Sequence, residues 1–310
     1  MSAGLRIGVV GCGAMGRNHV RLLAELAEAD LIGVYDSESD VSSGLALQFG
    51  TRLFDSMAEL ASEVEAVVLA VPTVLHADIG CALLDQGVHL LVEKPIAPSL
   101  EEADRLIASA AGKVLAVGHV EFFNPAVEAL LDQGSSPRFV VVERLSSFTP
   151  RSLDVDVVLD LMIHDLQILQ ALDESPLVEV RAVGIAVLSE RIDIADARLE
   201  FESGCVANVT ASRISAETVR CLRAFLEDRY LSLDYREQSL AGFHLEPVGG
   251  DTSPQNRMSP VEVPIERQEP LRRELERFIA ACRGADVRYV DGIQGRRALA
   301  CAHRILEAIK

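Results

Sequence analysis

The chain has 310 residues, 49% of them hydrophobic and 25% charged, which predicts a globular protein long enough for two domains with full cores. Its formal net charge of -18 argues against unspecific binding to nucleic acid or to an anionic membrane surface, because both are negative themselves. No apolar run is long enough to span a membrane and no signal-peptide pattern precedes the first predicted strand, so we expect a cytoplasmic protein. The six cysteines show no metal-ligand spacing, and we interpret them as reduced packing residues with no bound metal.

Short apolar runs alternate with helical patterns over roughly the first 118 residues. The predicted strands are 5–11, 31–36, 66–72, 89–95 and 114–120, and the predicted helices are 15–27, 41–49, 77–87 and 99–112. Continuous apolar strands separated by helices indicate a parallel sheet that is covered on both faces. We therefore predict a doubly wound α/β domain over residues 1–121.

After Phe123 the strands become longer and alternate apolar with polar residues. The predicted strands are 138–148, 177–188, 196–202, 205–214, 220–227, 230–235 and 240–247, and the predicted helices are 157–172, 271–282 and 294–309. Short turn signals between neighbouring strands suit antiparallel hairpins. Residues 247–264 are rich in Gly, Pro and Ser and form the one long breaker-rich stretch. This pattern predicts an α+β domain with a mostly antiparallel sheet over residues 122–310.

The segment GCGAMG, residues 11–16, is a GxGxxG that follows a predicted strand and opens a predicted helix. In this context Gly11 permits the tight turn, Gly13 lets the backbone approach a pyrophosphate, and Gly16 allows close packing of helix on strand. The helix N-terminus supplies the anion site. We predict a dinucleotide-binding loop formed by Gly11, Gly13, Ala14, Met15 and Gly16.

Asp36 ends the second predicted strand, 20 residues after Gly16. A carboxylate there accepts hydrogen bonds from a free ribose 2′-OH and repels a 2′-phosphate. Ser37 follows where an NADP enzyme often offers Arg. The sequence predicts NAD as the cofactor in preference to NADP or FAD.

Two further segments lie at the carboxyl ends of predicted parallel strands, VPTVLH at 71–76 and VEKP at 92–95. Such ends line the ligand crevice of an open parallel sheet. Lys94 is either functional there or a surface lysine that extends to solvent. His76, like His19, is either close to the nucleotide or has a helix-surface or capping role. The predicted cofactor contacts from these segments are Pro72, Thr73, His76, Glu93 and Lys94.

The apolar run VVLDLMIHDLQILQ, residues 157–170, contains Asp160 and His164 at helical spacing, which places both on one face. It predicts a mostly buried helix with one polar edge. The pair is either a satisfied surface contact or part of a functional site.

The segments GCGAMGRNH, AVPTVLH, EKP, GHVEFFNP and DLMIHD occur in an order and spacing that resemble the glucose-fructose oxidoreductase and inositol dehydrogenase family, Gfo/Idh/MocA. The resemblance spans essentially the whole chain. It implies an NAD(P)-binding first domain and a second domain whose open-faced sheet carries the substrate site. It also implies a homodimer or homotetramer built through that sheet, since one face of an open sheet needs a cover.

The resemblance implies that Lys94, Asp160 and His164 are catalytic and surround the sugar carbon that is oxidised. The polar edge of the 157–170 helix is then expected to face the nicotinamide. Oxidation of a secondary alcohol needs a base near the hydroxyl, and His164 suits this role at neutral pH while Asp160 orients its ring. Lys94 can share the proton transfer. Which of Lys94 and His164 takes the proton stays open.

The segment GHVEFFNP resembles a GHxERFNP motif, which makes Glu121 and Asn124 candidate substrate contacts. Asn124 is alternatively a plain turn residue. Phe122 stands where the motif has Arg, which weakens the case for an ionic contact at that position.

The segments GHVEFFNP, VERLSSFTPRS at 142–152 and VVLDLMIHD most resemble the UDP-N-acetylglucosamine 3-dehydrogenase branch of the family. This resemblance implies a 3-keto nucleotide sugar that an aminotransferase converts to a 3-amino sugar for lipid A or surface glycans. A diphosphate needs donors, for which Arg144, Arg151 and Arg213 are the candidates. Two alternatives stay open: a dehydrogenase of a free polyol such as inositol, and a non-catalytic NAD-binding regulator.

Overall fold

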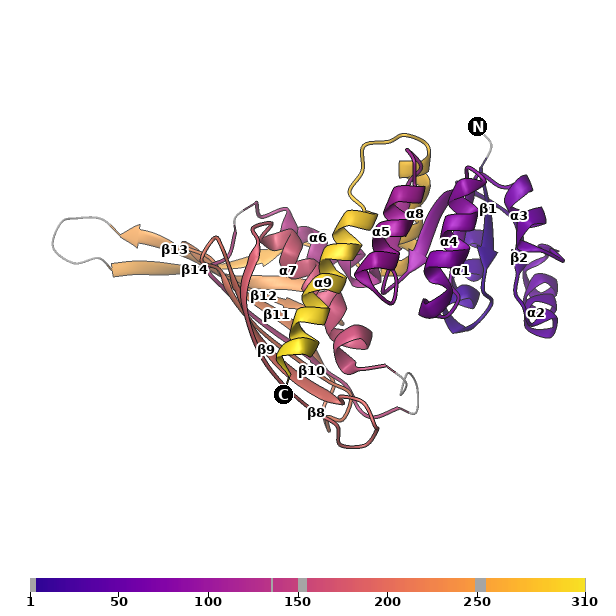
Figure 1. Cartoon of the computed structure of the whole chain (residues 1–310). Coiled ribbons are helices and arrows are strands. Elements are labelled where there is room, and N and C mark those ends of the chain that lie inside the picture. The colour runs from indigo at the N-terminus through magenta and orange to yellow at the C-terminus, as the bar shows by residue number, and fades with distance from the viewer. Residues whose placement is uncertain (1–3, 135, 150–154, 249–254, 310) are drawn as a thin grey trace. The chain divides into compact units, whose positions relative to one another are not determined.

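The protein is described by a computed structural model that covers residues 4–134, 136–149, 155–248 and 255–309. The chain forms two compact units (Figure 1). The first unit comprises Met1–Val120 and Glu269–Leu299, and the second comprises Glu121–Gln268 and Ala300–Lys310.

The first unit is built on a six-stranded sheet in the order β3-β2-β1-β4-β5-β6, with every neighbouring pair parallel. Its strands are β1 (Leu5–Val10), β2 (Ala29–Tyr35), β3 (Arg52–Leu53), β4 (Ala66–Leu69), β5 (His89–Glu93) and β6 (Leu115–Gly118). The order reverses at β1, where such sheets bind ligands. The predicted doubly wound domain is confirmed; the two-residue strand β3 is too short to give a sequence signal.

Helices connect these strands. They are α1 (Ala14–Glu25), α2 (Ser39–Phe49), α3 (Met57–Glu63), the short 3-10 turn η1 (Thr73–Leu75), α4 (His76–Asp85) and α5 (Leu100–Ser109), joined later in the chain by α8 (Pro270–Cys282). Ser56 and Ser99 cap α3 and α5 by accepting hydrogen bonds from backbone N–H groups three residues on.

Helix α8 belongs to the first unit, although the sequence predicted that residues 122–310 form one domain. Its apolar stripe, which includes Leu271, Leu275 and Phe278, is buried in the same core cluster as Val20 and Leu22 of α1. A periodic apolar pattern shows that a helix has a buried face but not which sheet it covers. The prediction is therefore corrected for residues 269–299.

The second unit is built on an eight-stranded sheet in the order β14-β13-β12-β11-β7-β10-β9-β8. Its strands are β7 (Phe139–Leu145), β8 (Leu177–Ile185), β9 (Ile194–Phe201), β10 (Val206–Ser212), β11 (Val219–Phe225), β12 (Arg229–Asp234), β13 (Ser239–Val248) and β14 (Gln255–Val263). The neighbours β7 and β10 are parallel and the other pairs are antiparallel, so the predicted mostly antiparallel sheet is confirmed.

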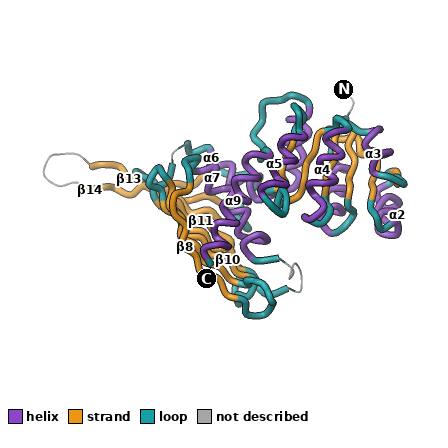
Figure 2. Tube along the Cα trace, in the orientation of Figure 1, coloured by secondary structure: helices purple, strands orange, loops and turns teal. Residues whose placement is uncertain are grey.

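Strand β14 lies within the breaker-rich residues 247–264, where no strand was predicted. It pairs with β13 over its whole length and forms one edge of the sheet. Pro260 fits there because an edge strand has one row of N–H groups that no neighbour needs. Figure 2 shows this hairpin extending beyond the other strands of the sheet.

The helical segments of the second unit lie on one face of its sheet (Figures 1 and 2). They are α6 (Pro125–Leu131), the π-helical turn η3 (Val158–Met162), α7 (Ile163–Leu172) and the last part of α9 (Gly292–Ala308), while the 3-10 turn η2 (Val120–Phe123) precedes α6. Along β9, Ala195, Ala197 and Leu199 are buried while Asp196 and Arg198 are exposed. One face is therefore core and the other is open. In the described parts of the chain, no helix combines the length and the apolar character that a membrane crossing demands.

Candidate functional site

A hollow of about 400 Å³ lies at the carboxyl ends of β1, β2 and β4 and includes the predicted glycine loop. Gly11 has a φ of 92°, and a Cβ there would lie 2.5 Å from the carbonyl oxygen of Ala70. At Gly16 a Cβ would lie 1.8 Å from the carbonyl oxygen of Gly11. Helix α1 can therefore pack this close to the loop after β1 only because residue 16 is a glycine. At Gly13 a Cβ would meet no atom within 4 Å. The backbone at Gly13 is thus open to a pyrophosphate at the start of α1.

Asp36 lines the same hollow, and two backbone groups hold its carboxylate. Oδ2 accepts a hydrogen bond from the Cys12 N–H at 2.6 Å, and Oδ1 accepts one from the Glu38 N–H at 2.9 Å. Each carboxylate oxygen can accept a further bond from a ribose hydroxyl. Glu38 also lines the hollow, a contact that the sequence analysis missed although it lies just past the strand end. Carboxylate acceptors fit the free ribose hydroxyls of NAD, and the two carboxylates of Asp36 and Glu38 disfavour a 2′-phosphate.

Among the other predicted cofactor residues, Ala14 and Met15 are exposed at the start of α1, and Pro72 lines the hollow. Thr73 begins the short turn η1. His76 is instead buried, with Nδ1 2.9 Å from the Pro95 carbonyl and Nε2 3.0 Å from the Val71 carbonyl. These contacts join the loops after β4 and β5, so His76 supports the loop and the prediction of a cofactor contact is corrected.

Lys94 follows directly after β5, at the same edge of the sheet as the glycine loop, and is half-buried. Its backbone N–H donates to Glu93 Oε2 at 3.3 Å. Glu93 is itself buried, and its Oε1 lies 2.7 Å from His19 Nε2 of α1. Glu93 therefore holds the backbone of Lys94, and the buried His19 contacts Glu93.

In the second unit, Asp160 lies in the π-helical turn η3 and His164 lies in the first turn of α7. Both side chains are half-buried, between fully buried Val158, Met162 and Ile163. The predicted polar edge is therefore present, but it passes through a π-helical turn that the periodicity did not reveal. Such single turns inside α-helices are frequent at functional sites.

Arg144, predicted to bind a diphosphate, is 3% exposed and is neutralised by the protein itself. It forms two hydrogen bonds with the buried Asp165 and a third with Glu121 at 2.8 Å. Its guanidinium also lies 4.9 Å from the ring centre of Tyr235, whose hydroxyl donates to Asp165. The ion pairs raise the pKa of Arg144 well above its usual value, although burial acts against this. The geometry contradicts a role in diphosphate binding.

Arg213 is also buried, at 5% exposure. It donates to the carbonyl oxygens of Val155 and Ile192 and lies 3.3 Å from the carboxylate of Asp193. These contacts anchor the chain entering η3 to the turn before β9, and they contradict the second predicted diphosphate donor. The third, Arg151, lies outside the described residues.

Glu121 and Asn124 have structural contacts in the second unit. Besides Arg144, Glu121 lies 3.7 Å from Arg220. Asn124 is 1% exposed, accepts the Ala126 N–H as the N-cap of α6, and donates to the Tyr235 carbonyl at 2.9 Å. The structure shows the turn role for Asn124. The predicted substrate contact is corrected, because the buried side chain is engaged by protein groups.

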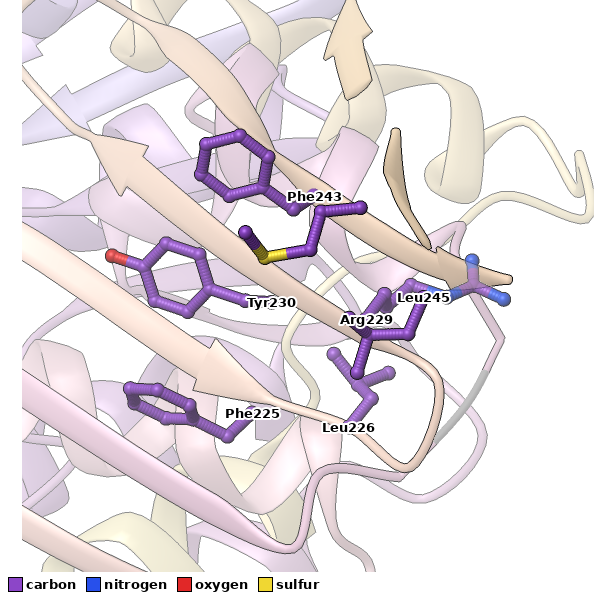
Figure 3. A pocket seen from close by; sticks show the side chains of 7 residues that line it. Phe225, Leu226, Arg229, Tyr230, Phe243 and Leu245 are labelled. Atoms are coloured by element: carbon purple, nitrogen blue, oxygen red, sulfur yellow. The ribbon is translucent and has the colours of Figure 1, made fainter. Parts of the chain in front are cut away.

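A second hollow, of about 450 Å³, lies on the open face of the larger sheet (Figure 3). Its walls are mostly apolar, with Phe225, Tyr230, Phe243 and Met258 among them. Neither Asp160 nor His164 lines it. It therefore does not contain the predicted catalytic residues of the second unit.

Known protein families match both parts of the chain. An oxidoreductase family with an NAD-binding Rossmann fold matches residues 5–119, and the Gfo/Idh/MocA C-terminal domain matches residues 110–229. The UDP-N-acetylglucosamine 3-dehydrogenase of Acidithiobacillus ferrooxidans is 37% identical, covering 99% of this chain and 97% of the relative. The inositol 2-dehydrogenase 2 of Saccharopolyspora erythraea is 26% identical over 98% and 93% of the two chains.

A solved structure of one of these relatives has the same fold as this chain. A structure of the Acidithiobacillus ferrooxidans enzyme superposes with a TM-score of 0.92, covering 99% of this chain and 98% of the other. The match to the NAD-binding Rossmann fold covers the glycine loop and Asp36. The chain belongs to the Gfo/Idh/MocA family of NAD-dependent oxidoreductases.

Proposed function

We propose that this oxidoreductase oxidises the C3 hydroxyl of a nucleotide sugar, UDP-N-acetylglucosamine, to the 3-keto sugar with NAD as the oxidant. The observation that carries the proposal is the 37% identity, over 99% of the chain, to a UDP-N-acetylglucosamine 3-dehydrogenase. The presence of Lys94, Asp160 and His164 supports it, because a protein that only sensed NAD would not need all three.

The reaction removes a hydride from the carbinol carbon and a proton from its hydroxyl. Bound NAD supplies the hydride acceptor. The proton needs a protein base within hydrogen-bond reach of the hydroxyl, and His164 is the residue whose ordinary pKa suits this near neutral pH. Asp160 orients the imidazole and stabilises its charged form, while Lys94 donates to the same hydroxyl.

The proposed roles divide between the two units. Lys94 belongs to the first unit, where Glu93 and His19 fix its backbone, and His164 belongs to the second. Since Arg144 and Arg213 are engaged by protein groups, Arg151 remains our candidate for the diphosphate.

A second candidate is oxidation of a free polyol. The burial of Arg144 and Arg213 favours it, because a polyol needs no diphosphate donors. The inositol 2-dehydrogenase among the relatives, at 26% identity, fits the same interpretation.

NADH formation with either UDP-N-acetylglucosamine or myo-inositol as substrate separates these candidates. A coupled aminotransferase or a ketone trap should be present, since the equilibrium can disfavour the keto product. Turnover of the nucleotide sugar alone supports the proposal, and turnover of myo-inositol alone replaces it with the second candidate. Failure of both substrates, with NADH binding retained, contradicts both.

The proposal includes the surroundings of the reaction. A 3-keto nucleotide sugar made in the cytoplasm is a substrate for an aminotransferase, which would supply a 3-amino sugar for lipid A or surface glycans. Through the open sheet face we also propose that the chain forms a homodimer or homotetramer.

A further inference from the structure

Strand β11 carries an arginine on the face of the larger sheet that the helices cover. Arg220 shares its side of the strand with Leu222 and Ala224, which are both buried in the core. The side chain of Arg220 is 39% exposed, so it lies at the border of this core. An arginine in such a place needs acceptors for its five N–H donors.

Arg220 lies directly opposite Arg144 of β7 in the sheet. Arg144 shares its side of β7 with the buried Val142, so both arginine side chains leave the same face of the sheet. Like charges directly opposite each other on antiparallel strands are unfavourable. Asp165 and Glu121 bind Arg144 by hydrogen bonds, which leaves Arg220 as the arginine whose charge needs an explanation.

The nearest carboxylate to Arg220 is already occupied by the other arginine. Arg220 Nη1 lies 3.7 Å from Glu121 Oε1, the oxygen that accepts a hydrogen bond from Arg144 Nη1 at 2.8 Å. The longer of the two distances exceeds that of a hydrogen bond. Arg220 Nε is buried and has no hydrogen-bond partner among the described residues, which is unfavourable. The guanidinium therefore keeps donors for a ligand.

The charge of Arg220 is incompletely compensated as well. Burial, followed by the charge of Arg144, lowers the pKa of Arg220. Glu121 and Asp165 oppose this effect without cancelling it, and Arg236 adds to it. The guanidinium is still charged at neutral pH, because the ordinary pKa of arginine is so high. An anionic ligand would supply the missing negative charge.

The contacts of Arg144 relate Arg220 to the proposed reaction. Arg144 binds Asp165 in the first turn of α7, and His164 precedes Asp165 in the chain. The end of the sheet that carries Arg220 is therefore the end that this turn of α7 contacts. A substrate bound at His164 would lie near this end of the sheet.

We infer that Arg220 binds the diphosphate of the substrate. A guanidinium presents two parallel N–H donors that match two phosphate oxygens. The identity of the ligand rests on the proposed function, in which Arg144 and Arg213 are unable to serve as donors. Arg220 adds to Arg151 a donor for the same group.

Calorimetry tests the contact without turnover. The protein is first saturated with NADH, so that the dinucleotide site is filled, and is then titrated with UDP-N-acetylglucosamine or with UDP. Arg220→Met should raise both dissociation constants by about 10-fold to 100-fold, the loss expected for a charge-assisted pair of hydrogen bonds. Arg220→Lys keeps the charge without the paired donors and should raise them less. Failure of UDP to bind the unmodified protein, or an effect confined to UDP-N-acetylglucosamine, overturns the inference.

Arg223 of the same strand provides a matched control. Its side chain has the same 39% exposure but leaves the opposite face of the sheet, where it donates to Glu143 at 2.7 Å. Arg223→Met should leave both dissociation constants unchanged. Equal effects of Arg220→Met and Arg223→Met, or no effect of either, contradict the assignment of Arg220.

Stability separates a ligand contact from a structural one. Without Arg220, Glu121 keeps its hydrogen bond from Arg144 and the repulsion between the two arginines is removed. Arg220→Met should therefore leave the urea midpoint unchanged or raise it, as is common where a residue serves binding at the expense of stability. A large fall of the midpoint in both Arg220→Met and Arg220→Lys would make Arg220 structural.

Kinetics distinguish failure of the inference from failure of the proposed function. If the nucleotide sugar is oxidised, Arg220→Met should raise its KM by about 10-fold to 100-fold and change kcat much less, because the diphosphate is bound alike before and during the reaction. Oxidation of the sugar with an unchanged KM in Arg220→Met refutes the inference alone. Binding of UDP through Arg220 without oxidation of UDP-N-acetylglucosamine refutes the proposed function and leaves the diphosphate contact standing.

Discussion

Arg144 donates two hydrogen bonds to the carboxylate of Asp165, from Nε at 2.6 Å and from Nη2 at 2.8 Å. The pair joins β7 to α7, the helix that also carries His164. Both side chains are almost completely buried, so neither charge can be left without the other. The pair holds α7 against the sheet. Because His164 lies on α7, the pair also determines the position of His164 relative to the sheet.

Replacing Arg144 should therefore lower the free energy of unfolding and need not raise KM for the substrate. Arg144→Met leaves Asp165 buried and without its cation, which should lower the free energy of unfolding by about 3–5 kcal/mol. Urea denaturation measures this. Arg198→Met removes an exposed ion pair with Glu200 and should cost about 1 kcal/mol or less. An Arg144→Met protein with unchanged stability and a raised KM for the nucleotide sugar would restore Arg144 as a substrate ligand.

Lys94 and His164 should be separable by their pH profiles. His164→Asn and Lys94→Ala should each lower kcat by about 100-fold to 10,000-fold if each moves or holds the hydroxyl proton. Loss of the near-neutral limb of the kcat profile in His164→Asn alone would identify His164 as the base. Lys113→Ala and His303→Asn serve as controls, and NADH binding, followed by fluorescence, should persist in both controls and in His164→Asn. Undiminished turnover in Lys94→Ala contradicts its catalytic assignment.

The local signals in the sequence predicted the first unit well. GCGAMG and Asp36 specify a strand end, a turn and a helix start that are neighbours in the chain, so their spacing alone determines the geometry. The helices between β1 and β6 were likewise predicted from apolar periodicity, apart from the short α3. The assignment of residues 269–299 to the second domain was wrong, because the partner of α8, helix α1, lies about 250 residues away in the sequence.

The candidate site was harder to predict where the answer depends on distant partners. Arg144 looked like a free cation because its partner Asp165 lies on another element, 21 residues away. His76 looked exposed to a ligand, although carbonyl groups of two loops enclose it. Burial decides each case, and burial is a property of the tertiary fold.

Asp36 should set the choice of cofactor. Asp36→Ser removes the carboxylate that accepts ribose hydroxyls and repels a 2′-phosphate, so the ratio of kcat/KM for NAD to that for NADP should fall by about 10-fold to 100-fold. The variant also loses the acceptor for the Cys12 and Glu38 N–H groups, so NAD binding should weaken. Asp40→Ser, on the following helix, provides the control. An unchanged ratio would shift the discrimination to Glu38.

The burial of His119 should lower the free energy of unfolding in mild acid. Burial, with a smaller effect of Lys94, lowers the pKa of His119 to about 3, whereas an unfolded histidine titrates near pH 6.5. Below about pH 6.5 the unfolded chain binds a proton that the folded protein refuses, so stability falls as the pH falls towards 3. The slope from this group approaches about 1.4 kcal/mol per pH unit. Burial lowers the pKa of His76 as well, which adds a change of the same sign.

Denaturation midpoints between pH 7 and 5, a range of about two units around the histidine pKa, measure this slope. His119→Phe should reduce the slope even if it lowers stability at every pH. His303→Phe replaces a half-buried histidine on α9 and provides the comparison. A slope in His119→Phe equal to that of the unmodified protein would show that His119 titrates alike in the folded and unfolded states.

The open face of the larger sheet carries a row of aromatic side chains. Phe139, Phe225, Tyr230 and Phe243 are successive cross-strand neighbours on β7, β11, β12 and β13. Ring centres are 5.6 Å apart for Phe139 and Phe225 and 5.0 Å apart for Phe225 and Tyr230. Phe225 and Phe243 are 38% and 43% exposed, and both line the apolar hollow in Figure 3.

Exposing such a row of apolar side chains to water is unfavourable. We expect the row to be buried against a second copy of the chain. Phe243→Glu places a charge in the row and should shift the mass measured by light scattering from dimer or tetramer to monomer. Phe148→Glu changes a phenylalanine of similar exposure outside the row and should leave the mass unchanged. If the unmodified protein is already a monomer at micromolar concentration, the expected self-association is wrong. If Phe243→Glu keeps the full mass, the subunits associate through another surface.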